Sequence, residues 1–285
     1  MKHEFLIAAV LALLPAGVCF GRQAATPTPT PTPVPSQTAT GPQVKSQGEL
    51  QAYQAINQAA TADARIKAAD DFLASYADSE LKPFVLLFIT DLYRQKNDFP
   101  DLVIYGKRAI EADPHNFVVR VWLANAFAAN TREFDLDKDQ KLQQAEDYAH
   151  QAIEVIKTAP KLSPKLTDAQ WDQMKADFNA QAHDAFALAA KVRKNYDAAI
   201  AEFQTAASLS PAPDPVRGIQ MAEVYRLAGK PDRALAEIDK ALASPGLDPA
   251  LKQAAENERA HALAAKPKPA APTADPAPAA VPPAK

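Results

Sequence analysis

The chain has 285 residues, a formal net charge of −3 and 23% charged residues, with 25 prolines, eight glycines and one cysteine. This balance excludes the strongly basic footprint of a nucleic-acid-binding protein at the level of the whole chain, and a lone cysteine cannot form an internal disulfide. Six prolines lie in residues 26–42 and seven in residues 266–285. The proline excess therefore belongs to two flanks, and the middle is alanine-rich with ordinary proline content.

The first residues have the pattern of an export signal. A short basic start is followed by ten apolar residues, FLIAAVLALL, and then by a segment of mostly small residues, PAGVCFG, that ends at Gly21. This run is shorter than the ~20 residues of a membrane-spanning helix and is typical of a secretory signal peptide, which we assign to residues 1–21. The alternative is a buried N-terminal helix, but nothing nearby in the sequence could cover it. We expect an exported protein, periplasmic or secreted.

Cys19 lies just after the apolar run, where the signal of a bacterial lipoprotein places the cysteine that is acylated. Such signals usually carry Gly, Ala or Ser before that cysteine, and here Val18 precedes it. Plain cleavage near Gly21 is therefore favoured. A lipid on Cys19 stays open as the alternative, and it is the one membrane contact that we expect of this chain.

Both proline-rich flanks are predicted to lie outside the folded part. Residues 26–35 read TPTPTPTPVP, and proline at every second position favours extended polyproline II. We assign residues 22–46 to a Thr/Pro-rich linker, with a ligand for a proline-recognition domain as the alternative. The Pro/Ala-rich tail over residues 266–285 lacks the large apolar residues of a core, which predicts disorder.

The middle of the chain contains an internal repeat with small residues spaced around one large one. The pattern occurs twice, thirty-five residues apart: Ala199, Phe203 and Ala206, then Ala234, Ile238 and Ala241. Apolar residues at i, i+3, i+4 and i+7 predict amphipathic helices. Alanine where two helices cross allows close approach, and each helix pair then has an apolar edge that only the next pair can cover.

These residues resemble the tetratricopeptide repeat, a helix–turn–helix unit of 34 residues. The resemblance covers about residues 48–245 and is strongest in the last two units. It implies an all-α, right-handed α-solenoid over residues 47–265. We expect a monomer built from five helix pairs and a capping helix that opens at Asp248 and Pro249. The predicted pairs span residues 48–78, 81–114, 116–158, 167–210 and 214–245.

Three segments depart from the simple pattern. Residues 84–90, FVLLFIT, read like a strand but fit a buried helix once the repeat register is set. Residues 159–166 form a proline-broken loop, and a long helix then runs from Thr167 to about Lys194. Trp171, Met174 and Phe178 lie on one stripe of this helix. We expect the stripe to pack against a neighbouring helix, with an exposed partner contact as the alternative.

Residues 135–146 match part of a calcium-loop pattern. Asp135, Asp137, Asp139 and Glu146 occupy positions 1, 3, 5 and 12, but Gln140 stands where an EF-hand needs Gly for its sharp turn. The repeat register also makes residues 141–146 helical. We favour an acidic turn whose side chains cap the following helix, with a calcium site as the alternative.

No motif for catalysis or cofactor binding stands out in the sequence. The histidines lie singly, without H-x-x-x-H or H-E-x-x-H spacing, and the chain has neither a G-x-S-x-G nor a phosphate-binding loop. No metal and no cofactor are predicted, and the protein is interpreted as a non-enzyme.

In the tetratricopeptide family the first helix of each pair lines a concave groove that holds peptides or partner helices. The resemblance implies that a protein or peptide partner contacts Asp91, Arg94, Asn125, Lys191, Glu223 and Arg226, with Ala128 and Leu188 at matching positions. Val121 stands where some relatives carry a lysine that clamps a terminal carboxylate, so that mode is not expected. The alternative for each residue is a solvated helical face.

The features together predict an exported scaffold that mediates protein–protein interactions in the cell envelope without catalysis. One alternative is a passive structural spacer of the envelope, in which the helices only separate the two flanks. The other is a helical-superhelix enzyme that acts on cell-wall glycan, with a carboxylic acid such as Glu223 or Asp91 in the groove.

Overall fold

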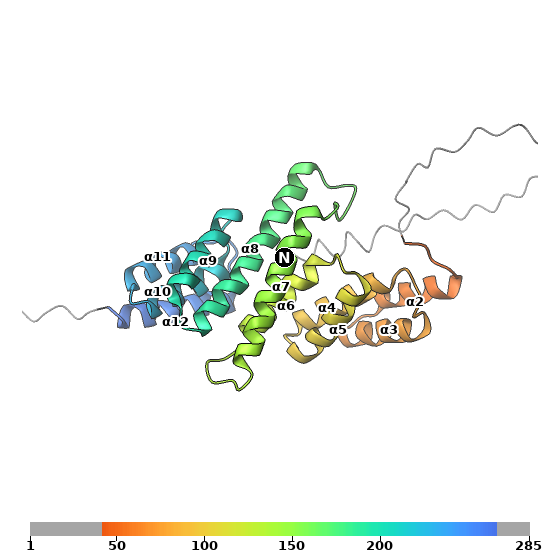
Figure 1. Ribbon diagram of the computed structural model, residues 1–285, viewed down its shortest axis with the longest axis horizontal. Helices are drawn as coiled ribbons and strands as arrows, with labels where there is room; N and C mark the ends of the chain where they lie inside the picture. Colours follow the sequence, from red (N-terminus) through yellow and green to blue (C-terminus); the bar gives the residue numbers. More distant parts are fainter. Residues whose placement is uncertain (1–41, 267–285) are drawn as a thin grey trace, which may run out of the picture. The chain divides into compact units, whose positions relative to one another are not determined.

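The computed structural model describes residues 42–266, and every regular element in this span is an α-helix (Figure 1). The all-α class predicted from the sequence is thus confirmed. The predicted signal peptide, Cys19, most of the Thr/Pro-rich linker and the tail beyond Lys266 lie outside the described residues. The chain divides into two compact units, one up to Pro211 and one from Ala212, and each is described by itself below.

The first unit consists of four helical hairpins. They are α2 (Gln47–Gln58) with α3 (Ala62–Ser75), α4 (Lys82–Gln95) with α5 (Phe99–Ala112), α6 (Phe117–Ala129) with α7 (Lys138–Thr158), and α8 (Asp168–Val192) with α9 (Tyr196–Leu209). Each hairpin packs on the next, through α3 on α4, α5 on α6, and both α6 and α7 on α8. This arrangement is the stacking of helix pairs that the repeat predicted.

The second unit is a hairpin with one further helix. It comprises α10 (Pro215–Leu227), α11 (Pro231–Leu242) and α12 (Pro249–Ala264), and each of these helices contacts the other two. The predicted start of α12 is confirmed, because the Asp248 side chain accepts a hydrogen bond from the backbone amide of Ala250 at 2.8 Å. Together the two units contain the five predicted helix pairs and the predicted final helix.

Short polar side chains determine where the helices begin. Eight N-cap residues accept a hydrogen bond from a backbone amide of the first turn: Ser46, Thr61, Asp98, Asn116, Thr167, Asn195, Asp214 and Asp248. Such caps satisfy amides that have no partner within the helix. The long predicted helix begins in this way, since Thr167 and Gln170 form a reciprocal capping box at the start of α8.

Small residues lie where helices cross, as the repeat predicted. Ala199 and Ala206 of α9 and Ala234 of α11 are fully buried, as are the large residues Phe203 and Ile238 between them. Because alanine has a small side chain, a neighbouring helix can approach closely at these positions. The larger residues Phe203 and Ile238, one turn away, fill the space beside the alanines.

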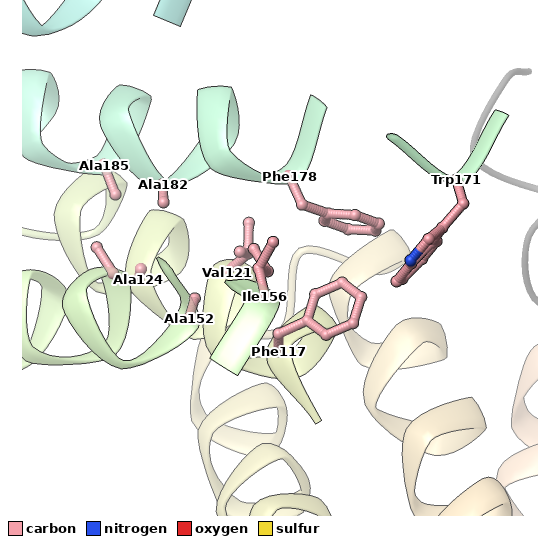
Figure 2. Packing of buried hydrophobic residues seen from close by; sticks show 10 residues of the cluster. Phe117, Val121, Ala124, Ala152, Ile156, Trp171, Phe178, Ala182 and Ala185 are labelled. Carbon is pink, nitrogen blue, oxygen red and sulfur yellow. The ribbon is translucent and has the colours of Figure 1, made fainter. Parts of the chain in front are cut away.

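A cluster of buried apolar residues lies among α6, α7 and α8 (Figure 2). The rings of Phe117, Trp171 and Phe178 gather at one end of it, and Phe117 meets Phe178 edge-on with ring centroids 5.1 Å apart. Ala124 of α6 and Ala152 of α7 belong to the same cluster, away from the three rings. The stripe on the long helix therefore packs against its neighbours as predicted, since Trp171 and Phe178 are buried and Met174 packs against the same cluster.

Residues 84–90 lie within α4, which confirms a helix rather than a strand. Gly106 of α5 lies at a close contact between α5 and α6. A Cβ at Gly106 would lie 2.9 Å from Cδ2 of Leu123 on α6, so the Leu123 side chain packs directly against the α5 backbone at this position.

Candidate protein-interaction surface

The first helices of successive hairpins lie next to one another in the first unit. Helix α6 contacts both α4 and α8, so a side chain on α4 can meet one on α6 without an intervening second helix. Four residues on α4 and α6 form the surface that we call the first-helix face: Arg94, Gln95, Trp122 and Asn125. The buried Asp91 supports it by accepting hydrogen bonds from Arg94 and Gln95. Two of them, Gln95 and Trp122, were not singled out by the repeat positions.

Asp91 organises the α4 part of this face. Its carboxylate is only 5% exposed and accepts hydrogen bonds from Arg94 Nε at 2.9 Å and Arg94 Nη2 at 2.6 Å. The Gln95 amide donates to the other carboxylate oxygen at 2.6 Å. Both oxygens of Asp91 are thus engaged, and the Arg94 side chain, 36% exposed, is held in one orientation.

Arg94 joins α4 to α6 by stacking on Trp122. The guanidinium carbon lies 4.9 Å from the centroid of the indole ring. A guanidinium over a Trp face is attracted by the ring quadrupole, by about 0.5–1 kcal/mol at an exposed site. Trp122 is half-buried and the Arg94 side chain is 36% exposed, so the stacked pair lies at the edge of the protein with part of each side chain in contact with solvent.

Asn125 connects α6 to α8. Its side-chain amide donates to the carbonyl of Val121 at 3.0 Å and to the carbonyl of Gln181 at 2.9 Å. Val121 itself is fully buried and belongs to the core cluster, so it offers no charge at the position where some relatives have a lysine. The Asn125 amide thus fixes the spacing of two first helices at the edge of the first-helix face.

The remaining predicted residues lie on α8 and α10. Lys191 and Glu223 are half-buried and each is engaged in an interaction. Arg226 donates to Glu258 of α12, from Nε at 2.5 Å and from Nη2 at 3.3 Å, and this pair joins α10 to α12 within the second unit. The structure thus brings Asp91 and Arg94 together on α4, whereas a single surface of all six residues stays a prediction.

Ala128 and Leu188 are not surface residues. They are 2% and 5% exposed, respectively, so the interpretation that they line a partner-binding surface is wrong, and the same holds for a direct partner contact by Asp91, which is also 5% exposed. Both occupy helix positions that turn into the core. Trp122 was missed because only two positions per first helix were considered, although its spacing of three residues from Asn125 places both on one side of α6.

The acidic segment between α6 and α7 has a different arrangement from a calcium loop. Helix α7 begins at Lys138, so Asp139 and Glu146 are helical, and Glu146 pairs with Arg193. Lys141 Nζ lies 3.3 Å from Asp135 and 2.9 Å from Asp137, which places an ammonium group between two of the expected ligands. Over residues 42–266 no group of three or more His, Cys, Asp or Glu side chains is arranged to hold a metal ion.

The prediction that aspartate side chains of this turn cap the start of α7 by hydrogen bonds is wrong. Asp137 precedes α7 but makes no side-chain hydrogen bond to the helix. Asp135 instead accepts the backbone amide of Arg132 at 3.1 Å, within the loop itself. This hydrogen bond, followed by the contact with Lys141, lowers the pKa of Asp135 despite the opposing effect of desolvation. The carboxylates therefore shape the loop and do not cap the helix.

In the part of the chain that is described, no helix has both the length and the apolar character needed to cross a bilayer.

Comparisons with known proteins find likenesses among solved structures. The chain is similar to a thermophilic TPR protein of Thermus thermophilus, with 21% identity, a TM-score of 0.46, and coverage of 74% of this chain and 95% of the other. It is also similar to a tetratricopeptide repeat protein from Parabacteroides merdae, with 16% identity, a TM-score of 0.37, and coverage of 76% and 88%. No protein-family model and no curated protein sequence matches the chain.

Proposed function

We propose that the protein is an exported scaffold that binds a protein or peptide partner through the first-helix face. The observation that carries this proposal is the stacked pair of Arg94 and Trp122, which is set across two neighbouring helices and braced by Asp91. Arg and Trp are enriched among the residues that dominate protein–protein binding energy.

The bracing of this pair supports a role in recognition. A side chain that is already held in its binding orientation loses little conformational freedom when a partner arrives. Arg94 is fixed by Asp91 and Trp122, and Asn125 fixes α6 against α8. The face therefore combines an aromatic plane with a cation, which suits a partner segment that carries an apolar side chain next to a carboxylate.

Export is proposed from the sequence of residues 1–21, whose short apolar run and small residues are typical of a cleaved signal. The proposed location is the periplasm or the exterior, with a lipid on Cys19 as the alternative anchor. N-terminal sequencing of the mature chain would distinguish the two, because cleavage after Gly21 removes Cys19 and lipoprotein processing leaves it as the first residue.

The glycan-enzyme alternative is weakened by the position of Asp91. Both of its carboxylate oxygens accept hydrogen bonds, from Arg94 and from Gln95, and the side chain is only 5% exposed. A glycosidase acid must instead reach the glycosidic oxygen of a bound glycan. The geometry of Asp91 therefore favours a role in recognition, and we propose no catalysis.

The proposal is tested by crosslinking in intact cells, with the full chain as bait and crosslinked partners identified by mass spectrometry. Trp122→Ala removes the aromatic plane and leaves the ion pair of Asp91 and Arg94 in place. We expect the yield of one specific crosslinked protein to fall about tenfold, which is the scale of a central contact residue.

A matched control is available on another helix. Arg108 lies over the ring of Tyr105 on α5 at 4.9 Å, which is the same kind of pair away from the first-helix face. Arg108→Ala should leave the crosslinked protein unchanged, and circular dichroism should show both variants folded. Equal yields for the two variants would contradict binding at the first-helix face and favour the passive-spacer alternative.

A further inference from the structure

Arg120 of α6 is a charged residue in a buried position. It lies five residues before Asn125, as Leu86 of α4 lies five residues before Asp91. Leu86 is fully buried, whereas Arg120 is 7% exposed and places a guanidinium group at the corresponding point of its helix. The fold therefore accepts a large apolar side chain at this point, and the presence of a cation needs another explanation.

The guanidinium of Arg120 has hydrogen-bond partners for only part of its donor set. Nη1 donates to the Asn116 carbonyl at 3.0 Å, and Nε donates to Oε1 of Gln151 on α7 at 3.3 Å. Both acceptors are uncharged. Among residues 42–266 no carboxylate oxygen lies within 4.0 Å of the Arg120 nitrogens, so the cation has no ion-pair partner there.

The surroundings of this cation are electrostatically unfavourable. Asn116 is the N-cap of α6, so the guanidinium lies at the positive end of the helix dipole. Burial lowers the pKa of Arg120, and the charge of Asp113 opposes this effect only through space. The Asp113 carboxylate itself accepts the His115 amide at 2.9 Å. A buried cation without a paired anion is costly, so an anion from solution would be stabilising here.

One donor nitrogen of Arg120 can be reached from solvent. Nη2 has no acceptor among the described residues, yet it is not one of the side-chain atoms of residues 42–266 that are buried without a hydrogen-bond partner. The small exposed part of the residue therefore includes this nitrogen. Gln151, whose oxygen faces Arg120, is exposed, and its NH2 group can donate a further hydrogen bond.

We propose that Arg120 and Gln151 bind a phosphate group at the junction of α6 and α7. The terminal N–H groups of a guanidinium point in parallel at two oxygens of an oxyanion, which a chloride ion cannot match. Phosphate also suits the positive end of a helix. Because little of Arg120 is exposed, the ligand is a free ion or the end group of a small ester. This site is separate from the first-helix face and does not rest on the proposed function.

The test follows the melting temperature of the full chain and the phosphorus NMR linewidth of inorganic phosphate. With phosphate at about twenty times a millimolar dissociation constant, binding should raise the melting temperature by about 4 °C. Arg120→Met puts an apolar chain where α4 has Leu86. It should abolish the shift and the line broadening, and the variant should be at least as stable as the unsubstituted protein without phosphate. Sodium chloride at the same ionic strength should give no shift.

Two further variants make the result specific. Gln151→Ala removes an exposed partner of Arg120 without disturbing the core, so it tests the site even if Arg120→Met does not fold. It should weaken phosphate binding about threefold, which is the scale of one hydrogen bond. Arg108→Met alters an exposed arginine on α5 and should leave phosphate binding unchanged.

The other outcomes distinguish the sources of the anion or overturn the site. Glycerol phosphate as a second probe separates a free ion from an ester, and binding of either supports the proposal. A melting shift that is equal in the unsubstituted protein and in Arg120→Met reflects exclusion of phosphate from the protein surface and overturns it. A shift with sodium acetate but none with phosphate overturns it in favour of a carboxylate ligand.

Discussion

Glu49 of α2 links the residues that precede this helix to the turn between α3 and α4. Its side chain is 1% exposed and accepts hydrogen bonds from the Ser79 hydroxyl at 2.5 Å and from the Lys45 amide at 2.6 Å. Burial alone would raise the pKa of Glu49, but these hydrogen bonds, the amide of Ser46 and the charge of Lys45 together hold it below the ordinary value of 4.5. The ionised carboxylate is therefore a stabilising feature of the folded state.

The pH dependence of this contribution can be predicted. Because the folded-state pKa of Glu49 is lowered, the unfolded state binds more protons between the two values, and the stabilisation is present above about pH 4.5 and lost as pH falls through the folded-state pKa. Glu49→Gln should lower the free energy of unfolding by about 1–3 kcal/mol at pH 7. The difference from the unsubstituted protein should shrink in acid, as measured by urea unfolding.

Glu80 provides the control. It accepts the Gln43 amide at 2.8 Å from the same segment but is exposed, so Glu80→Gln should change stability little at any pH. A Glu49→Gln difference that stays constant from pH 7 to below pH 4 would show that the carboxylate contributes through packing alone.

At the scale of elements, one turn geometry recurs at three hairpins. Asn97, Lys194 and Gly229 each follow a first helix with positive φ, at 54°, 62° and 71°. In each case the amide of the next residue bonds back to a carbonyl of the helix, as Lys230 does to Tyr225 at 2.8 Å. This is the Schellman arrangement, which favours glycine because only glycine lacks the Cβ clash.

The three turns should respond differently to substitution. Gly229→Ala should lower the free energy of unfolding by about 1 kcal/mol, whereas Lys194→Gly should raise it by a few tenths to about 1 kcal/mol. Asn97→Gly should have a smaller effect, since Asn tolerates this conformation. Each is measured by chemical unfolding against the unsubstituted protein.

A substitution at Ala228 tests whether positive φ is the cause of the stability changes predicted for Gly229 and Lys194. It directly precedes Gly229 but has φ −79°, where glycine gains nothing, so Ala228→Gly should destabilise. If Lys194→Gly also destabilised, its surface ion pair with Glu133 would outweigh the relief of backbone strain.

Helix boundaries were predictable because their causes are local. Thr167 and Asp248 are N-caps whose partners lie within three residues, and Gly229 marks a turn that its own φ requires. The interactions of Glu146 and Arg226 were not predictable in this way. Their partners, Arg193 and Glu258, are 47 and 32 residues distant, so only the packing of whole helices brings them together.

At the scale of the whole molecule, the two units of the described chain differ in how many large apolar side chains they bury. The first unit buries large side chains such as Phe72, Phe117 and Phe203 along its four hairpins. In the second unit the large buried apolar residues are Met221, Val224, Tyr225 and Ile238, and the other buried apolar residues are alanines. Units shorter than about 60 residues bury a smaller share of their surface and are only marginally stable.

The two units are therefore predicted to differ in stability as separate fragments. A fragment of residues 42–211 should be helical by circular dichroism and should unfold cooperatively in urea. A fragment of residues 212–266 should lose its helicity at lower urea concentration, and Arg226→Ala should unfold it further by leaving Glu258 buried without its partner. Failure of the 42–211 fragment to fold would show that the second unit is required for the first.

The sequence by itself determined the number of helices in the described chain, their pairing, and the small residues at their crossings. It could do so because apolar periodicity, caps and turn residues act over a few positions. The tertiary structure alone decided which polar side chains are available to a partner. Asp91 lies at a predicted surface position but is buried beneath Arg94 and Gln95, whereas Phe134 and Leu136, apolar by composition, stand in water. Exposure depends on which helix or loop lies against a residue, and that is set by contacts between segments far apart in the chain.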